Sequence, residues 1–105
     1  MKNIQTRLDR IKRVVSLLTG EDESKIRVLR DYRGKFFLYC GSLRSHRKFW
    51  SYIAEQLGFY KDEYEYENLL RKHNGVHECE TSPVFDTVED LLDFMEEVLL
   101  KISLK

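Results

Sequence analysis

The first eighteen or so residues have apolar positions at helical spacing. The steps between them alternate between four and three residues, and Gly20 follows where helices commonly end in a left-handed residue. This predicts an amphipathic helix over residues 2–19 with a narrow apolar seam. A seam of this width suits packing against one neighbouring helix, and it permits a dimer formed through residues 4–18. The seam residues are Ile4, Leu8, Ile11, Val15 and Leu18.

The C-terminal segment has the clearest helical pattern in the chain. Asp86 with Glu89 is expected to start this helix, and its apolar residues fall within an arc of about 120°. Acidic residues fill an arc of similar width on the opposite side. Leu100 lies among these acids and Phe94 at their margin, and interfaces often place an apolar anchor within a charged rim. We call the following residues the acidic face: Glu89, Asp90, Asp93, Glu96, Glu97 and Leu100.

Between the two ends, shorter patterns predict a β-hairpin, two helices and a strand. The hairpin strands are residues 25–30 and 35–40, with Gly34 in the turn, and the acidic run 21–24 before them is expected to be a solvated loop. A helix is expected from the N-cap Ser45 to Leu57 and another over residues 62–72. Residues 76–80 follow as a strand, and Pro83 lies in a turn. The order α-β-β-α-α-β-α predicts one small α+β domain over residues 1–105, with an antiparallel or mixed sheet packed against helices.

Length and composition restrict the number of domains and the cellular compartment. A chain of 105 residues has room for one domain with its own core. Its longest apolar run is residues 36–40, far below the ~20 residues that a membrane helix needs, and the first residues lack the apolar stretch of a signal peptide. Two cysteines are too few for a disulfide scaffold of this size. We therefore expect a cytoplasmic protein with reduced thiols and no membrane partner.

The formal net charge of zero conceals a division between the two halves of the chain. Residues 1–50 hold 13 Lys and Arg against 5 Asp and Glu, and residues 51–105 hold 5 against 13. Such asymmetry bears on the choice of partners. One interpretation is that the halves face and neutralise each other. The other is that the molecule presents two faces of opposite sign, at least one of which binds a partner.

Candidate catalytic and metal-binding residues are few. His73, His77 and Cys79, with Cys40 as a fourth ligand, have a metal-like spacing, but zinc ligands usually arrive as close pairs on turns and Cys40 comes from a separate strand. Cys40 and His46 could form a nucleophile and base across a turn, although a cysteine ending an apolar strand usually acts as a small hydrophobe. The glycines form no phosphate-binding loop. We expect no cofactor and no enzymatic activity.

The basic half mixes cations with aromatic rings around the hairpin and the start of the second helix. Cations for phosphates and rings for bases are the composition of a nucleic-acid surface. The competing interpretation is that Phe49 and Trp50 belong to the core, because they keep helical spacing. The cations of this candidate surface are Arg27, Arg30, Arg33, Lys35, Arg44, Arg47 and Lys48.

One segment resembles a known family. Trp50-x2-Ile53-Ala54-x2-Leu57-Gly58, followed by Asn68-Leu69-Leu70-Arg71-Lys72, is similar to the second and third helices of Myb-like (SANT) domains. The resemblance covers about a quarter of the chain and implies a helix-turn-helix that contacts DNA or histone tails. Two features depart from the family: the segment before Trp50 has a strand pattern, and the third helix begins with acids that phosphates would repel.

Two functions follow as expectations. The first is a non-enzymatic regulatory or inhibitory protein that binds another protein through the acidic face. The alternative is a nucleic-acid-binding protein that uses the basic, aromatic-rich hairpin and the second helix. The two differ in which half of the divided charge meets the partner.

Overall fold

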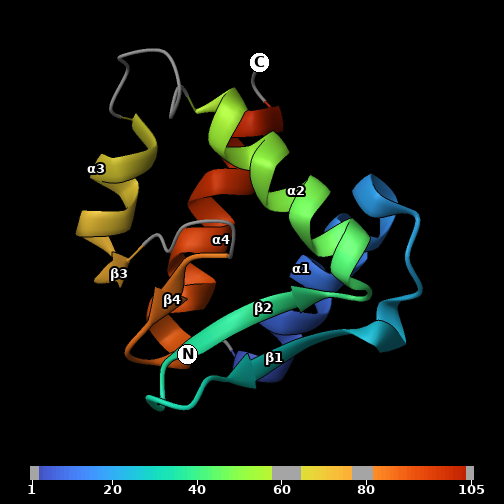
Figure 1. Cartoon of the computed structure of the whole chain (residues 1–105), viewed down its shortest axis with the longest axis horizontal. Coiled ribbons are helices and arrows are strands. Elements are labelled where there is room, and N and C mark those ends of the chain that lie inside the picture. The colour runs from blue at the N-terminus through green and yellow to red at the C-terminus, as the bar shows by residue number, and fades with distance from the viewer. Residues whose placement is uncertain (1–2, 58–64, 77–81, 104–105) are drawn as a thin grey trace.

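The computed structural model describes residues 3–57, 65–76 and 82–103, which form helices and an antiparallel four-stranded sheet (Figure 1). The α+β class is confirmed, and the order of elements follows the expected one with one additional strand. The elements are α1 (Ile4–Thr19), the 3₁₀ turn η1 (Glu23–Lys25), β1 (Ile26–Arg30), β2 (Phe36–Cys40), α2 (Leu43–Gln56), α3 (Glu65–Lys72), β3 (Gly75–Val76), β4 (Val84–Phe85) and α4 (Val88–Ser103).

The strand order is β1-β2-β4-β3, and every neighbouring pair is antiparallel. In Figure 1, α1 and α4 lie behind the sheet and α2 crosses above β2. One face of the β1–β2 hairpin therefore packs against helices. The expected strand 76–80 begins in β3, and its later residues lie outside the described ranges. The strand β4 was not expected, because two residues are too few to show an alternating pattern.

The C-terminal end of α1 matches the sequence prediction, whereas the helix begins at Ile4 and Asn3, which was expected to be helical, caps it. The Asn3 side chain accepts a hydrogen bond from the Gln5 N–H, and Gly20 adopts φ 78° with its N–H donating to the Ser16 carbonyl. Ile11 and Val15 of the seam are buried in the core. The middle of the seam is thus used within the chain rather than left free for a second copy.

The hairpin turn is fixed by one carboxylate. Asp31 Oδ1 accepts hydrogen bonds from the N–H groups of Arg33 and Lys35, both at 2.9 Å, and Gly34 takes φ 81°. Ile26 pairs with Cys40 and Arg30 with Phe36, which sets the register of the strands. Because side chains alternate between the faces of a strand, the burial of Leu38 and Cys40 puts Phe37 and Tyr39 on the outer face.

The start of α2 differs from the prediction in its cap. Ser42, not Ser45, is the N-cap, and its Oγ accepts a hydrogen bond from the Ser45 N–H. Both hydroxyls donate to the Glu21 carboxylate, at 3.0 and 2.7 Å, which lowers the pKa of Glu21. Glu21 was expected to lie in a solvated loop, but it ties the end of α1 to the start of α2. Gly41, with φ 94°, permits this contact, since a Cβ there would lie 2.9 Å from the Glu21 side chain.

The helix α4 is buried more broadly than its apolar arc indicates. Its N-cap bond comes from Thr87, whose Oγ1 accepts from the Asp90 N–H, rather than from Asp86. Phe94, expected at the margin of the acidic side, is fully buried. Its ring packs against rings from four other segments, because α3 covers a second side of α4. These rings belong to Trp50, Tyr66, His73 and Phe85.

Candidate functional site

The acidic face of α4 contacts a cation from α1, Arg7. The Arg7 guanidinium lies 2.5 Å from Asp93 Oδ1 and 2.5 Å from Glu96 Oε1, and its side chain is only 14% exposed. These hydrogen bonds to Glu96 and then Asp93 raise the pKa of Arg7 further above its ordinary value. Two of the five carboxylates of the acidic face therefore serve contacts between helices.

A third carboxylate of the acidic face points to α3. Glu97 Oε1 accepts a hydrogen bond from Lys72 Nζ and lies 3.2 Å from His73 Nε2. The Lys72 hydrogen bond and then that of His73 lower the pKa of Glu97, against the effect of burial. Asp93, Glu96 and Glu97 are thus engaged on both flanks of α4.

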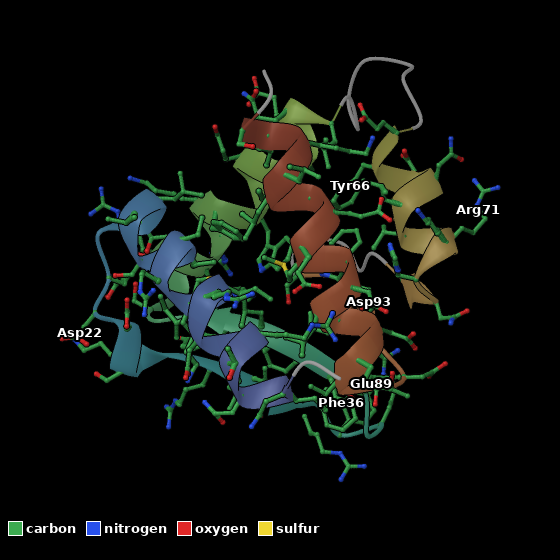
Figure 2. All side chains as sticks on the ribbon, turned by 180° about the vertical axis from the view of Figure 1, so that it is seen from behind. Asp22, Phe36, Tyr66, Arg71, Glu89 and Asp93 are labelled. Atoms are coloured by element: carbon green, nitrogen blue, oxygen red, sulfur yellow. The ribbon has the colours of Figure 1, made fainter. Side chains whose placement is uncertain are left out.

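The rest of the acidic face is open to solvent. Glu89 is exposed near the start of α4, where Figure 2 shows it with Asp93 one turn further on. Asp90 is half-buried, and Leu100 is 60% exposed. Among the described residues, no salt bridge involves Glu89 or Asp90. Their position in the first turn also suits the partial positive charge of a helix N-terminus.

The cations of the other half divide into two groups. Lys35 pairs with Asp86, and the Arg33 guanidinium lies 2.9 Å from Asp31 Oδ2. The second group makes no salt bridge within the described part of the chain, although Arg30 stacks its guanidinium 5.0 Å from the centre of the Phe36 ring. All members of this group are exposed: Arg27, Arg30, Arg44, Arg47 and Lys48.

The aromatic rings near these cations also divide. Phe49 and Trp50 are buried, and Trp50 Nε1 donates to the Leu38 carbonyl at 3.4 Å, so neither ring is exposed for a base to stack on. Tyr32 at the hairpin turn is 95% exposed. On the outer face of the strands, the half-buried Phe37 and Tyr39 lie opposite Leu29 and Arg27 in the register.

His46 joins the start of α2 to this outer face. Its ring stacks on Tyr39 with centroids 5.2 Å apart and meets Phe37 edge-on at 6.2 Å. The cations at the start of α2 are therefore close to the outer face of the hairpin. Arg30 is not part of this outer face, because it pairs with Phe36 and stacks on the Phe36 ring. We call the following residues together the basic surface: Arg27, Arg44, Arg47, Tyr32, Phe37 and Tyr39.

The environment of Cys40 and His46 opposes nucleophilic catalysis. Burial raises the pKa of the Cys40 thiol to about 12 and lowers the pKa of His46 to about 4. His46 Nδ1 accepts a hydrogen bond from the Cys40 N–H at 3.3 Å. Nucleophilic catalysis needs a thiolate and a ring nitrogen that can take its proton. Here the thiol stays protonated and His46 Nδ1 already accepts a hydrogen bond from the backbone.

Of the four candidate metal ligands, the structure describes only Cys40 and His73. His73 contacts Glu97 and Phe94, while His77 and Cys79 lie outside the described ranges. In residues 3–57, 65–76 and 82–103, no three ligating side chains gather around one point.

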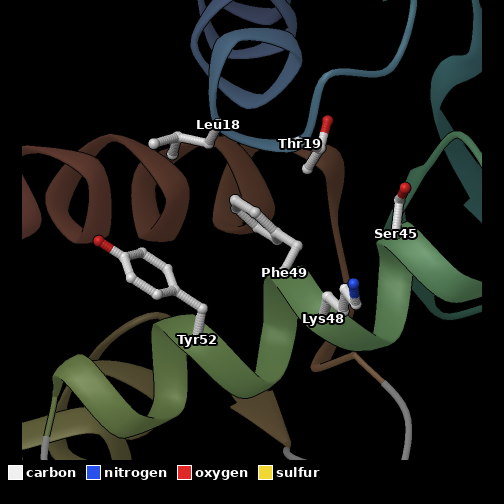
Figure 3. A pocket seen from close by; sticks show the side chains of 6 residues that line it. All are labelled: Leu18, Thr19, Ser45, Lys48, Phe49 and Tyr52. Carbon is white, nitrogen blue, oxygen red and sulfur yellow. The ribbon is translucent and has the colours of Figure 1, made fainter.

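A groove of about 350 Å³ opens between the end of α1 and the first half of α2 (Figure 3). Its α1 wall comprises Leu18 and Thr19. Nearby on α1, Leu17 is 81% exposed and Val14 is also exposed. Val14 and Leu17 are apolar residues beside the seam in the sequence, and this is the signal that points to an additional apolar surface on α1. The lining residues are Leu18, Thr19, Ser45, Lys48, Phe49 and Tyr52.

The segment that resembles Myb-like domains forms α2 and α3. Trp50, Ile53, Ala54 and Leu57 are buried, so the shared positions are core positions. A β-hairpin precedes α2, where the family has its first helix. The resemblance is therefore limited to the packing pattern of two helices.

None of the described helices is long and apolar enough to cross a membrane. No protein-family model, curated protein or solved structure matches the chain.

Proposed function

We propose that this chain is a non-enzymatic binding protein whose ligand is single-stranded nucleic acid, held on the basic surface. The observation that carries the proposal is the uneven use of charge. The acidic half uses Asp93, Glu96 and Glu97 to hold α4 against α1 and α3, whereas Arg27, Arg44 and Arg47 have no ionic partner in the described residues. Exposed cations without partners are free to neutralise phosphates.

The rings of the basic surface favour a single strand over a duplex. Unpaired bases expose their faces, and stacking on a protein ring contributes about 1–3 kcal/mol per base. Tyr32 at the hairpin turn is 95% exposed, with the Arg33 guanidinium 5.5 Å from the centre of its ring, and Tyr39 lies half-buried opposite Arg27. A strand running along the hairpin would place its phosphates near Arg27 and Arg47 and its bases near these rings.

The experiment measures fluorescence anisotropy of a labelled oligothymidylate at increasing salt. We expect the affinity to fall with salt, with a slope of about −0.7 per phosphate contact. The double variant Arg27→Glu/Arg47→Glu should bind at least about tenfold more weakly. Tyr32→Ala should weaken the single strand more than a duplex of the same length, because only unpaired bases stack.

A matched control separates this surface from net charge. The double variant Arg10→Glu/Arg71→Glu changes the charge by the same amount at exposed positions on α1 and α3; Figure 2 shows Arg71 on α3. It should retain affinity within about twofold of the unmodified chain. Equal losses in the two double variants, or no binding by the unmodified chain at low salt, would refute the proposal.

Protein binding through the acidic face, the other function expected from the sequence, has weaker support. Three of its carboxylates already have partners, so the prediction now depends on Glu89, Asp90 and the exposed Leu100. We also propose a cytoplasmic setting, in which the buried Cys40 thiol would stay reduced.

A further inference from the structure

None of the described residues that line the groove between α1 and α2 belongs to the basic surface. Figure 3 shows Leu18 and Thr19 reaching down from the end of α1 towards Phe49 and Tyr52 on α2, with α4 behind them. The α2 residues that line it recur at positions 45, 48, 49 and 52, so they form one stripe along two turns of the helix. The stripe extends for about 10 Å, at ~1.5 Å per residue.

The walls of the groove leave large apolar side chains in water. Leu18 is 47% exposed and Tyr52 is 41% exposed. One turn before Leu18, Val14 is exposed on the same side of α1, and Leu17 follows it at helical spacing. The fold does not need these contacts, since Ile11 and Val15 already anchor α1 in the core. Neighbouring apolar groups left in water mark an interaction surface.

Cations flank the apolar residues, and the Glu21 carboxylate lies at one end of the groove, where it accepts a hydrogen bond from Ser45. Lys48 lines the groove, and Arg44 precedes it by one turn on α2. On α1, Arg10 and Arg13 stand one turn before Val14 and Leu17. Arg13 has one distant carboxylate, Glu23 Oε1, at 3.8 Å, and both groups are at least half-exposed. A partner that fits this rim therefore brings negative charge.

The same charges disfavour a second copy of the chain as the occupant. Packing α1 against another α1 would add a second Arg10 and Arg13 to a contact that already holds these cations. The acidic face of α4 could not easily supply the negative charge from a second copy, because its Asp93 and Glu96 already pair with Arg7 and its Glu97 with Lys72. An acidic surface of a different protein meets neither obstacle.

We propose that the α1–α2 groove binds an acidic amphipathic helix of a partner protein. One large apolar side chain of that helix enters between Leu18 and Tyr52, and its Asp and Glu residues face Lys48, Arg44 and Arg10. An amphipathic helix laid in an apolar groove is an established mode of recognition, and the two-turn stripe on α2 matches its repeat. This gives the chain a protein partner in a groove that adjoins the surface proposed for nucleic acid and shares only the flanking Arg44 with it.

The test uses two synthetic helical peptides with the same leucine spacing, one with glutamates beside the leucines and one with lysines in their place. Binding is followed by amide chemical shifts of the ¹⁵N-labelled chain. We expect the acidic peptide to bind at least about tenfold more tightly and to shift residues 18, 19, 48 and 52. Lys48→Glu should reverse the preference, which a loss of folding cannot do.

A second pair of variants tests the apolar contact. Leu18→Asp should abolish binding of the acidic peptide. Leu43→Asp is the matched control, because Leu43 is 57% exposed on α2 and does not line the groove, and it should bind as the unmodified chain does. The amide spectrum of each variant, recorded without peptide, reports its fold.

Several outcomes would overturn the proposal. Equal affinity for the two peptides would show that charge does not select the occupant, and absence of binding by both would show that the groove does not take a helix. A concentration-dependent dimer that Leu18→Asp dissociates would make a second copy the occupant. If oligothymidylate, rather than the acidic peptide, shifted residues 18 and 52, the groove would belong to the nucleic-acid surface.

Discussion

The α1–α4 flank and the hairpin–α2 surface both concentrate charge, but the charge has different partners in the two regions. On the flank, Arg7 lies between Asp93 and Glu96 and is largely shielded from water. On the hairpin and α2, Arg27 and Arg47 are exposed and make no salt bridge within the described residues. One region thus joins two helices, while the other is free to meet a ligand.

The difference teaches that the charge division of the sequence has two causes. Part of it is internal, because basic α1 lies beside acidic α4 and part of the charge cancels at that contact. The remaining positive charge gathers where His46 packs α2 onto the outer face of the hairpin. Three experiments break or sharpen this comparison.

The largest expected effect concerns His46, and it separates the packing of α2 on the hairpin from the ion pairs of α4 by the pH at which each is lost. Burial lowers the pKa of His46 to about 4 from 6.5, so the unfolded chain takes up a proton first as the pH falls. The stabilisation is present above pH 6.5 and is lost between 6.5 and about 4. A shift of this size corresponds to at most about 3 kcal/mol, and residual solvent access reduces this to about 2 kcal/mol. Urea denaturation at several pH values measures it.

The α3–α4 contact should respond to acid later. The pKa of Glu97 is lowered, so its contribution is present above its unfolded pKa of 4.5 and is lost only as the pH falls through the folded value. His46→Gln should therefore flatten the stability curve between pH 6.5 and 4.5 and leave the decline below 4.5 in place. An unchanged slope in His46→Gln would show that His46 is not the source of the acid sensitivity.

The second effect concerns Arg7 on the flank. Arg7→Ala leaves Asp93 and Glu96 without their cation, and both carboxylates are more than a third exposed, so solvent screens much of the loss. We expect the free energy of unfolding to fall by about 1–2 kcal/mol. Arg10→Ala is the control, since Arg10 is exposed on the same helix and makes no salt bridge in the described ranges, and it should change stability by less than about 0.5 kcal/mol. Equal effects of the two variants would mean that the ion pairs of Arg7 do not hold α1 to α4.

The fold class and the C-terminal ends of α1, α2 and α3 were predictable because their signals are local, whereas the residues that cap the starts of α2 and α4 were not. The seam and Gly20 define α1, and Gly34 with Asp31 defines the hairpin turn. Contacts between distant segments were not predictable from local patterns. Glu21 was placed in a solvated loop because nothing in its neighbourhood shows that Ser42 and Ser45 will meet it.

The sequence predicted which residues make up the candidate surfaces, but not which of their side chains are left exposed to bind a partner. A helical wheel groups Asp93, Glu96 and Glu97 with Glu89, but only the packing of α1 and α3 shows which carboxylates are engaged. The same wheel put Phe94 at the margin of the acids, although α3 buries it. The groove depends on how far α1 and α2 stand apart, which no pattern along one helix reports.

The smallest expected effect is on the stability of the charge-reversed hairpin. Arg27→Glu/Arg47→Glu changes two exposed side chains that make no salt bridge in the described residues, so the free energy of unfolding should change by less than about 0.5 kcal/mol. The same variant is expected to lose nucleic-acid affinity, and stability that does not change would assign that loss to the binding surface rather than to unfolding. Urea denaturation beside Arg7→Ala makes the comparison direct. A larger loss than in Arg7→Ala would mean that the cations of the hairpin and α2 support the fold, and the contrast between the two regions would fail.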